Sequence, residues 1–314
     1  MSTESQAVVE QAAGSGPRPG FFGDLALRLP ALRRSEWLLS VFFLYIAMLG
    51  QWRGGGFPQR STLALLIPLA LLVLARVDSR SSSRVWSMVR DWVPALLVLI
   101  AYWSADWVAQ PQGSRALENA LIGWDRSLLN DWRLRAAIER FGVLLPALLD
   151  LAYLLTYAVP PLAIAYFYIR HERRRLDDFL FPFLLGTLMT YSLLPLFPSE
   201  APRFVFAGQD LPGVETVFRR FSLWILNHCD IRASVFPSGH VTVGFSAAFA
   251  MMLAMPEQRR ASWTLLALAL LVLVNTVYGR YHYAADGLAG LLVSLVALGL
   301  VLAHRAAAVG RRRT

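Results

Sequence analysis

The chain has 314 residues, of which 56% are hydrophobic and only 16% are charged, and its mean hydropathy is +0.47. This composition excludes an ordinary soluble domain and predicts that most of the chain lies in lipid. The formal net charge is +9, but the arginines that supply it gather between apolar stretches, where membrane topology and anionic lipid explain them better than nucleic acid, which is not expected as a partner.

Residues 1–35 precede the first apolar stretch. The first 20 are polar and contain glycine and proline, and they lack the basic-then-apolar order of a cleaved signal peptide. We expect them to form a disordered tail. Residues 21–34 mix phenylalanine and leucine with arginine, which predicts a segment that lies along the membrane surface.

Eight segments are long and apolar enough, or nearly so, to cross a bilayer, which takes about 20 residues, or about 17 where flanking side chains reach back to the interface. They predict an all-α integral membrane protein with about eight transmembrane helices. The segments are residues 36–52, 62–77, 92–108, 153–169, 178–197, 239–255, 263–279 and 287–304. No internal repeat or second soluble domain is visible.

The apolar run before the fourth predicted span begins near Gly142 and contains Asp150. A carboxylate is costly in the middle of a bilayer. We therefore expect residues 142–152 to form a re-entrant or interfacial approach rather than part of the span.

The arginines predict the orientation. Residues 78–91, 170–177 and 256–262 are short connections rich in arginine, and so is the tail at 305–314. The positive-inside rule places these segments in the cytoplasm together with both termini. We expect a multi-pass protein of a bacterial inner (plasma) membrane, with the opposite helix ends on the outer, periplasmic face.

A first polar cluster, RYHYAAD, occupies residues 280–286 at the mouth of the last span. His282 and Asp286 are four residues apart, so on a helix that begins here they share one face. A carboxylate beside one imidazole nitrogen fixes the tautomer and leaves the other nitrogen free to attack or to move a proton. On its own, this spacing also describes a polar helix cap.

A second cluster, FPSGH, occupies residues 236–240. The two apolar stretches between the clusters carry the chain across the membrane and back, so both clusters reach the same face. Ser238 and Gly239 stand at a helix start, where backbone N–H groups favour an anion, and His240 is suited to protonate a leaving oxygen. As a bare tetrapeptide, PSGH also fits a helix start with Ser238 as its N-cap.

Two arginines stand near these clusters, Arg203 in LFPSEAPRF and Arg280 in RYHYAAD. Each is a candidate to bind a phosphate through its guanidinium group. Alternatively, each anchors its helix end at the membrane interface. Asp125 and Arg126 are neighbours and are expected to pair. Residues 228–230, His-Cys-Asp, have no second group at zinc-ligand spacing, so no metal or cofactor is predicted.

PSGH followed by HxxxD across two membrane spans, preceded by an arginine at the end of an earlier span, resembles the type 2 phosphatidic acid phosphatase (PAP2) superfamily. The resemblance implies a six-helix catalytic core formed by the last six spans, residues 92–304. Residues 36–77 would then be two added helices. RYHY and the segment 118–132 resemble the branch that contains inositol phosphorylceramide synthases, which are inositolphosphotransferases.

The resemblance also implies roles for individual residues. His282 would be the nucleophile that forms a phosphohistidine, with Asp286 as its orienting partner, and His240 would protonate the departing alkoxide. The phosphate oxygens would be held by Ser238, Gly239 and Arg203.

Two positions depart from the superfamily pattern. Leu196 stands where the first motif usually has lysine, and Asn275 and Thr276 stand where the third motif usually has serine and arginine. Arg280 is our candidate for supplying the missing charge from a shifted position.

These inferences predict a metal-independent lipid phosphatase or phosphotransferase that acts on a lipid phosphate or phosphodiester at the outer membrane face. Hydrolysis and transfer of a head group to a lipid alcohol both remain open, as do the lipid substrate and the oligomeric state. A non-catalytic lipid transporter is a further alternative, although its polar residues would be expected at mid-membrane.

Overall fold

The computed structural model describes residues 32–54, 57–110, 115–231 and 234–310, and over these ranges it contains helices and turns without a strand. This confirms the predicted all-α membrane fold. The expected disordered tail and nearly all of the expected surface segment lie outside the described residues.

Eight helices correspond to the eight predicted segments. They are α2 (Arg34–Arg53), α4 (Leu66–Arg80), α5 (Arg84–Asp106), α8 (Leu144–Ile169), α9 (Leu176–Leu193), α12 (Gly239–Ala254), α13 (Arg259–Tyr278) and α14 (Ala284–Gly310). Shorter helices join them: α3 (Phe57–Leu63), α6 (Ala116–Arg126), a π-helical turn (Ser127–Asp131), α7 (Leu134–Glu139), α10 (Pro202–Val205) and α11 (Val217–Cys229), with 3₁₀ turns η2 (Arg173–Arg175) and η3 (Leu194–Leu196).

Six helical stretches of the described chain are long and apolar enough to cross a membrane. These are Gln59–Arg80, Arg84–Asp106, Leu144–Ile169, Arg173–Leu196, Arg259–Tyr278 and Ala284–Ala308. The two other predicted segments form helices outside this group: α12 is apolar but has only 16 residues, and α2 carries Arg34, Glu36 and Arg53 near its ends. The structure therefore supports fewer full-length spans than the eight predicted.

The expected re-entrant approach at residues 142–152 is wrong, because α8 runs without interruption from Leu144 to Ile169. Asp150 is fully buried inside the protein and does not face lipid. Its carboxylate accepts hydrogen bonds from the Thr216 hydroxyl at 2.7 Å and from the Asn275 side-chain amide at 3.3 Å. These donors replace the water that the carboxylate loses, so a membrane helix can contain it.

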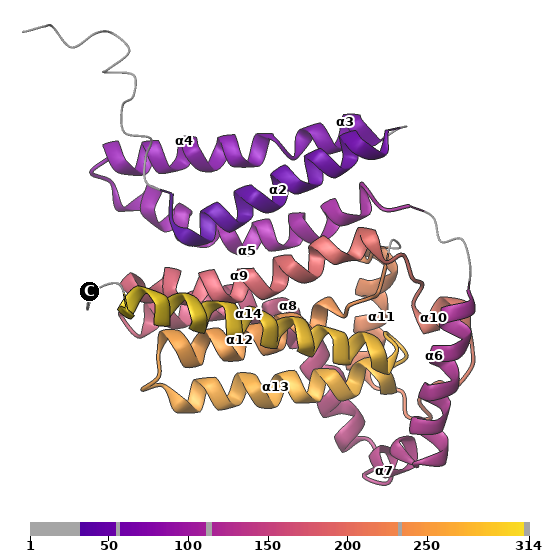
Figure 1. Cartoon of the computed structure of the whole chain (residues 1–314). Helices are drawn as coiled ribbons and strands as arrows, with labels where there is room; N and C mark the ends of the chain where they lie inside the picture. The colour runs from indigo at the N-terminus through magenta and orange to yellow at the C-terminus, as the bar shows by residue number, and fades with distance from the viewer. Residues whose placement is uncertain (1–31, 55–56, 111–114, 232–233, 311–314) are drawn as a thin grey trace, which may run out of the picture.

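Helices α9 and α12 lie at the centre of a bundle that also contains α8, α13 and α14, while α2, α3, α4 and α5 form a layer along one side of it (Figure 1). The short helices α6, α7, α10 and α11 gather at one end of the bundle. At the opposite end lie the arginine-rich connections that join α8 to α9 and α12 to α13. The two histidine motifs are at the end that the short helices cover.

Buried ion pairs join α2 to α5, and α5 to the bundle, at the arginine-rich end. Arg90 on α5 donates to Glu36 on α2 at 2.5 and 2.6 Å, and both side chains are at most 9% exposed. Asp91 pairs with Arg33 at 2.6 Å and with Arg173. Each of these buried charges has a partner, and the pairs link α2, α5 and the connection before α9 at this end.

Candidate active site

The two histidine motifs meet where α12 and α14 begin. The backbone N–H of Ser238 donates to the backbone carbonyl of Asp286 at 2.9 Å. Gly290 on α14 permits this contact, since a Cβ atom at that position would lie only 2.6 Å from the Ser238 carbonyl oxygen. The starts of the two helices are thereby joined through their backbones.

His282 lies in the turn between α13 and α14, not on the helix that was expected to begin there. The carbonyl of Thr276 accepts the N–H groups of both Tyr281 and His282 at 3.0 Å, and Arg280 adopts a left-handed backbone conformation with φ 63°. These contacts end α13 and turn His282 towards α12.

The ring of His282 is held by a backbone carbonyl. Its Nδ1 lies 2.9 Å from the carbonyl oxygen of Val235, and because a carbonyl oxygen only accepts, Nδ1 must carry the proton. The Nε2 atom then has a free lone pair. The side chain is 8% exposed, so this nitrogen is sheltered from bulk water.

Asp286 lies close to the same nitrogen without a hydrogen bond to it. Its Oδ2 is 3.6 Å from His282 Nδ1, and it accepts the N–H of Tyr283 at 2.9 Å. The carboxyl group is fully buried. Asp286 therefore places a negative charge beside the imidazole, while the Val235 carbonyl sets the tautomer; its orienting role stays a prediction.

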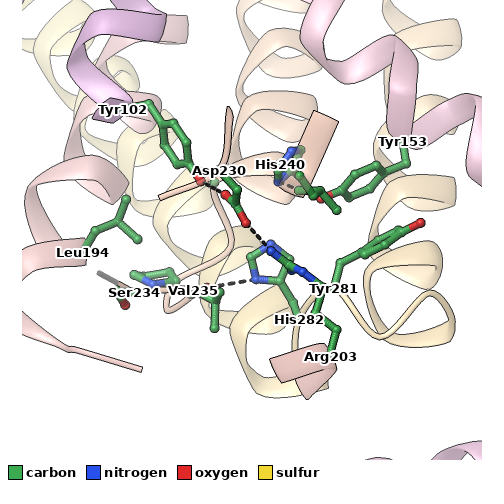
Figure 2. Close-up of a pocket in the computed structure, with 13 residues that line it drawn as sticks. Tyr102, Tyr153, Leu194, Arg203, Asp230, Ser234, Val235, His240, Tyr281 and His282 are labelled. Carbon is green, nitrogen blue, oxygen red and sulfur yellow. Dashed lines mark hydrogen bonds and ion pairs between the residues drawn. The ribbon is translucent and has the colours of Figure 1, made fainter. Parts of the chain in front are cut away.

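His240 occupies the first turn of α12 between two tyrosines. Its ring stacks on Tyr153 at a centroid distance of 4.4 Å and meets the edge of Tyr157 at 5.1 Å. The Tyr153 hydroxyl lies 3.4 Å from His240 Nδ1, which leaves Nε2 for proton exchange. The centroids of His240 and His282 are 5.8 Å apart, so both imidazoles border the same space (Figure 2).

Arg203 on α10 reaches this space from the side. One of its terminal nitrogens contacts the carboxylate of Asp230, which also accepts the Tyr102 hydroxyl (Figure 2). The Arg203 side chain is 9% exposed, and its Nε is buried without a hydrogen-bond partner among the described residues. A buried donor of this kind needs an acceptor, and a phosphate oxygen would supply one.

The central pocket is small, with room of about 10 Å³, enough for a single water. It is lined by Tyr102, Tyr153, Leu194, Arg203, Leu226, Asp230, Ser234, Val235, Pro237, Gly239, His240, Tyr281 and His282. Two larger cavities adjoin it. One is apolar, about 340 Å³, and lies between α5, α8, α11 and α12; the other, about 270 Å³, is bordered by Arg115, Ser199 and Glu200.

Ser238 and Gly239 take different positions relative to this pocket. Gly239 is part of the lining. Ser238 is fully buried and absent from the lining, and its hydroxyl accepts the Val241 N–H at 3.4 Å as an N-cap. The phosphate-binding roles of both residues stay predictions, and the geometry favours Gly239.

Arg280 is turned into the protein and is not among the lining residues. It is 1% exposed and donates to Asp125 at 2.9 Å, and Asp125 also accepts the Ala284 N–H at 3.0 Å. Burial raises the pKa of Asp125 to about 6. The expected pair of Asp125 with Arg126 is wrong, because Arg126 instead donates to Asp210 at 2.8 Å. The phosphate-binding role of Arg280 stays a prediction.

Sequence reasoning missed four groups at the pocket: the hydroxyls of Tyr102 and Tyr153, the carbonyl of Val235 and the carboxylate of Asp230. The tyrosines lie in apolar helices, where they read as ordinary span residues. Asp230 stands in the His-Cys-Asp run, where the sequence indicates neither a metal site nor a place at the pocket. The signal that the sequence offers for Asp230 is its position at the same membrane face as Arg203 and Arg280, where a carboxylate can pair with an arginine.

Comparisons with known proteins agree with the motif resemblance. A family model described as the PAP2 superfamily matches residues 119–300, which is more than half of the chain. The chain is also similar to a PA-phosphatase related-family protein of Dictyostelium discoideum, with 28% identity over 131 residues. That match covers 40% of this chain and 23% of the relative, so the chain spans less than a quarter of the relative's length. No solved structure matches.

Proposed function

Since the chain belongs to the PAP2 superfamily, we propose that it is a membrane lipid phosphatase or phosphotransferase that works through a phosphohistidine at His282. The observation that carries this proposal is the setting of His282. Its Nδ1 is committed to the Val235 carbonyl, and it shares one pocket with His240 and Arg203.

In the first step, Nε2 of His282 attacks phosphorus. The bond from phosphorus to the lipid oxygen breaks, its electron pair goes to that oxygen, and protonated His240 gives it a proton. The Arg203 Nε donates to a non-bridging phosphate oxygen, and the start of α12 at Gly239 presents backbone N–H groups to the same anion. Asp286 balances the positive charge of the phosphorylated imidazole.

In the second step, the acceptor completes the reaction. His240, now neutral, takes a proton from water or from an acceptor alcohol, whose oxygen attacks phosphorus as the N–P bond breaks. The electrons of that bond return to His282 Nε2, which restores the starting state. Hydrolysis and transfer to a lipid alcohol thus use the same groups, and access of the acceptor decides between them.

The apolar cavity supports a lipid substrate. It is lined by residues such as Val98, Trp103, Ile225 and Val243, and it reaches Gly239 and His240 at one end. Hydrocarbon in this cavity would leave the polar end of the lipid at the two histidines.

The position of the site supports action at the outer, periplasmic face. The pocket lies at the ends of the bundle helices opposite the arginine-rich connections, which the positive-inside rule assigns to the cytoplasm. A bacterial inner membrane location is part of this proposal. A lipid transporter, by contrast, needs no nucleophile.

The test is to incubate purified protein with labelled lipid phosphates and follow free phosphate, new phospholipid and acid-labile phosphoprotein. We expect turnover and a phosphoprotein that both disappear in His282→Ala. His304→Ala is the matched control, since His304 is exposed at the far end of α14. Full activity in His282→Ala, or no product from any lipid class, would refute the proposal.

A further inference from the structure

The fixed charges at the pocket cancel. Of the described residues that line it, Arg203 and Asp230 carry a full charge at neutral pH, and they form an ion pair with side chains 9% and 10% exposed. The two histidines are the other titratable bases. For a substrate phosphate in the pocket, the positive charge of Arg203 is therefore already neutralised by Asp230.

The charges around the pocket follow the same pattern. Arg280 is paired with Asp125 at 2.9 Å, and Arg115 is paired with Glu200 at 3.1 Å. Asp286 adds a further negative charge behind His282. Arg280 and Arg115 therefore add no uncompensated positive charge beside the pocket.

This balance discriminates between two kinds of phosphate. A phosphomonoester carries close to two negative charges at neutral pH, because its second pKa is about 6, whereas a phosphodiester carries one. Against the neutral Arg203–Asp230 pair, a diester brings one uncompensated negative charge and a monoester brings two. A second charge would be buried without a partner, which costs free energy.

The cavities on either side of the pocket provide an independent observation. The apolar cavity shares Tyr102, Asp230, Gly239 and His240 with the pocket, and the more polar cavity shares Arg203, Asp230 and Val235. Phosphorus in a diester carries two substituents, and a cavity lies on each side of the pocket for them. A monoester would use only one of them.

We infer that Asp230 is a specificity-determining residue that makes this pocket select singly charged phosphodiester lipids over doubly charged phosphomonoester lipids. The inference rests on the proposed function and names its substrate class. The hydrocarbon part lies in the apolar cavity, and the second substituent lies beside Arg115, Ser199 and Glu200.

The experiment compares two lipids with identical acyl chains, dioleoyl phosphatidylmethanol and dioleoyl phosphatidate, in the same detergent micelles. Both release diacylglycerol when His282 attacks, so one product reports both reactions. We expect the wild type to have the higher kcat/KM with phosphatidylmethanol. In Asp230→Asn, where the carboxylate charge is lost, we expect the ratio of the two kcat/KM values to fall by about tenfold or more.

Two variants separate charge from position. Asp230→Glu keeps the charge and is expected to keep the preference for the diester. Tyr102→Phe removes a hydrogen bond to Asp230 without changing its charge, so the ratio should stay the same whatever happens to the absolute rates.

Each outcome has one meaning. A wild type that prefers phosphatidate, or a ratio that is unchanged in a folded Asp230→Asn variant, overturns the inference and leaves the proposed function intact. If Asp230→Asn does not fold, the wild-type preference still decides. Absence of diacylglycerol and phosphoprotein with both lipids would instead count against the proposed function.

Discussion

Replacing Asp286 by asparagine removes a negative charge beside His282 and little else. The side chain keeps its size and retains an oxygen for the Tyr283 N–H. The tautomer of His282 should also persist, because the Val235 carbonyl holds its Nδ1–H. In the proposed mechanism, this change would remove the attraction between the carboxylate and the positive charge on the phosphorylated imidazole.

The structure sets the size of this loss. At the 3.6 Å between Asp286 Oδ2 and His282 Nδ1, two unit charges in an effective dielectric of about 20 attract each other by about 5 kcal/mol. This is an upper limit, since the full charge develops only at the intermediate. We expect kcat to fall by about 10²- to 10³-fold, less than the roughly 10⁴-fold seen where a carboxylate alone sets the tautomer.

The assay is the rate of phosphoprotein formation and of product release in a single turnover with excess enzyme. Asp286→Ala is the companion variant, and it should lose more because it also leaves the Tyr283 N–H without its acceptor. Activity of Asp286→Asn within twofold of wild type would refute the electrostatic role. A loss as complete as that of His282→Ala would show that the Val235 carbonyl does not fix the ring.

Three further predictions concern stability, measured as thermal unfolding in detergent. Asp150→Ala should lower the free energy of unfolding by about 3 kcal/mol, because the buried Thr216 and Asn275 donors lose their shared acceptor. An unchanged midpoint of thermal unfolding would contradict this. Gly290→Ala should cost about 1 to 3 kcal/mol through its clash with the Ser238 carbonyl, whereas Gly299→Ala, with open space around it, should be neutral. Burial raises the pKa of Asp125 from 3.8 to about 6. The protonated carboxyl therefore contributes about 3 kcal/mol to the free energy of unfolding. This contribution is fully present below the pKa of the unfolded chain and is lost as the pH rises through 6. In Asp125→Asn, this fall in the free energy of unfolding between pH 4 and 7 should disappear. The same fall in wild type and variant would refute the prediction.

The membrane fold could be predicted because hydropathy dominates it. Most predicted segments coincide with long apolar helices. In lipid, backbone N–H and C=O groups must find their hydrogen-bond partners within the protein, and a helix provides them. The error at Asp150 arose because hydropathy does not show whether a polar side chain faces lipid or protein. Its partners Thr216 and Asn275 come from α11 and α13, far along the chain.

The site could be predicted only in outline. Two apolar stretches of matching length placed His240 and His282 at one membrane face, and their rings are neighbours in the structure. The groups that position them are not visible in the sequence, because the Val235 carbonyl is a backbone atom and Tyr102 lies 128 residues from Asp230. Such contacts depend on how helices pack, which local spacing does not encode.

The backbone hydrogen bond from Ser238 to Asp286 has a consequence for how this protein can diversify. It joins the two segments that carry the histidines, and so restrains His240 and His282 relative to each other. Much of the apolar cavity is walled by α5, α8 and α11, which lie outside those two segments. If the cavity holds the hydrocarbon chains of a lipid, as proposed, substitutions in the α5 and α11 walls would change which chains fit without altering the hydrogen bond that joins the two histidine segments.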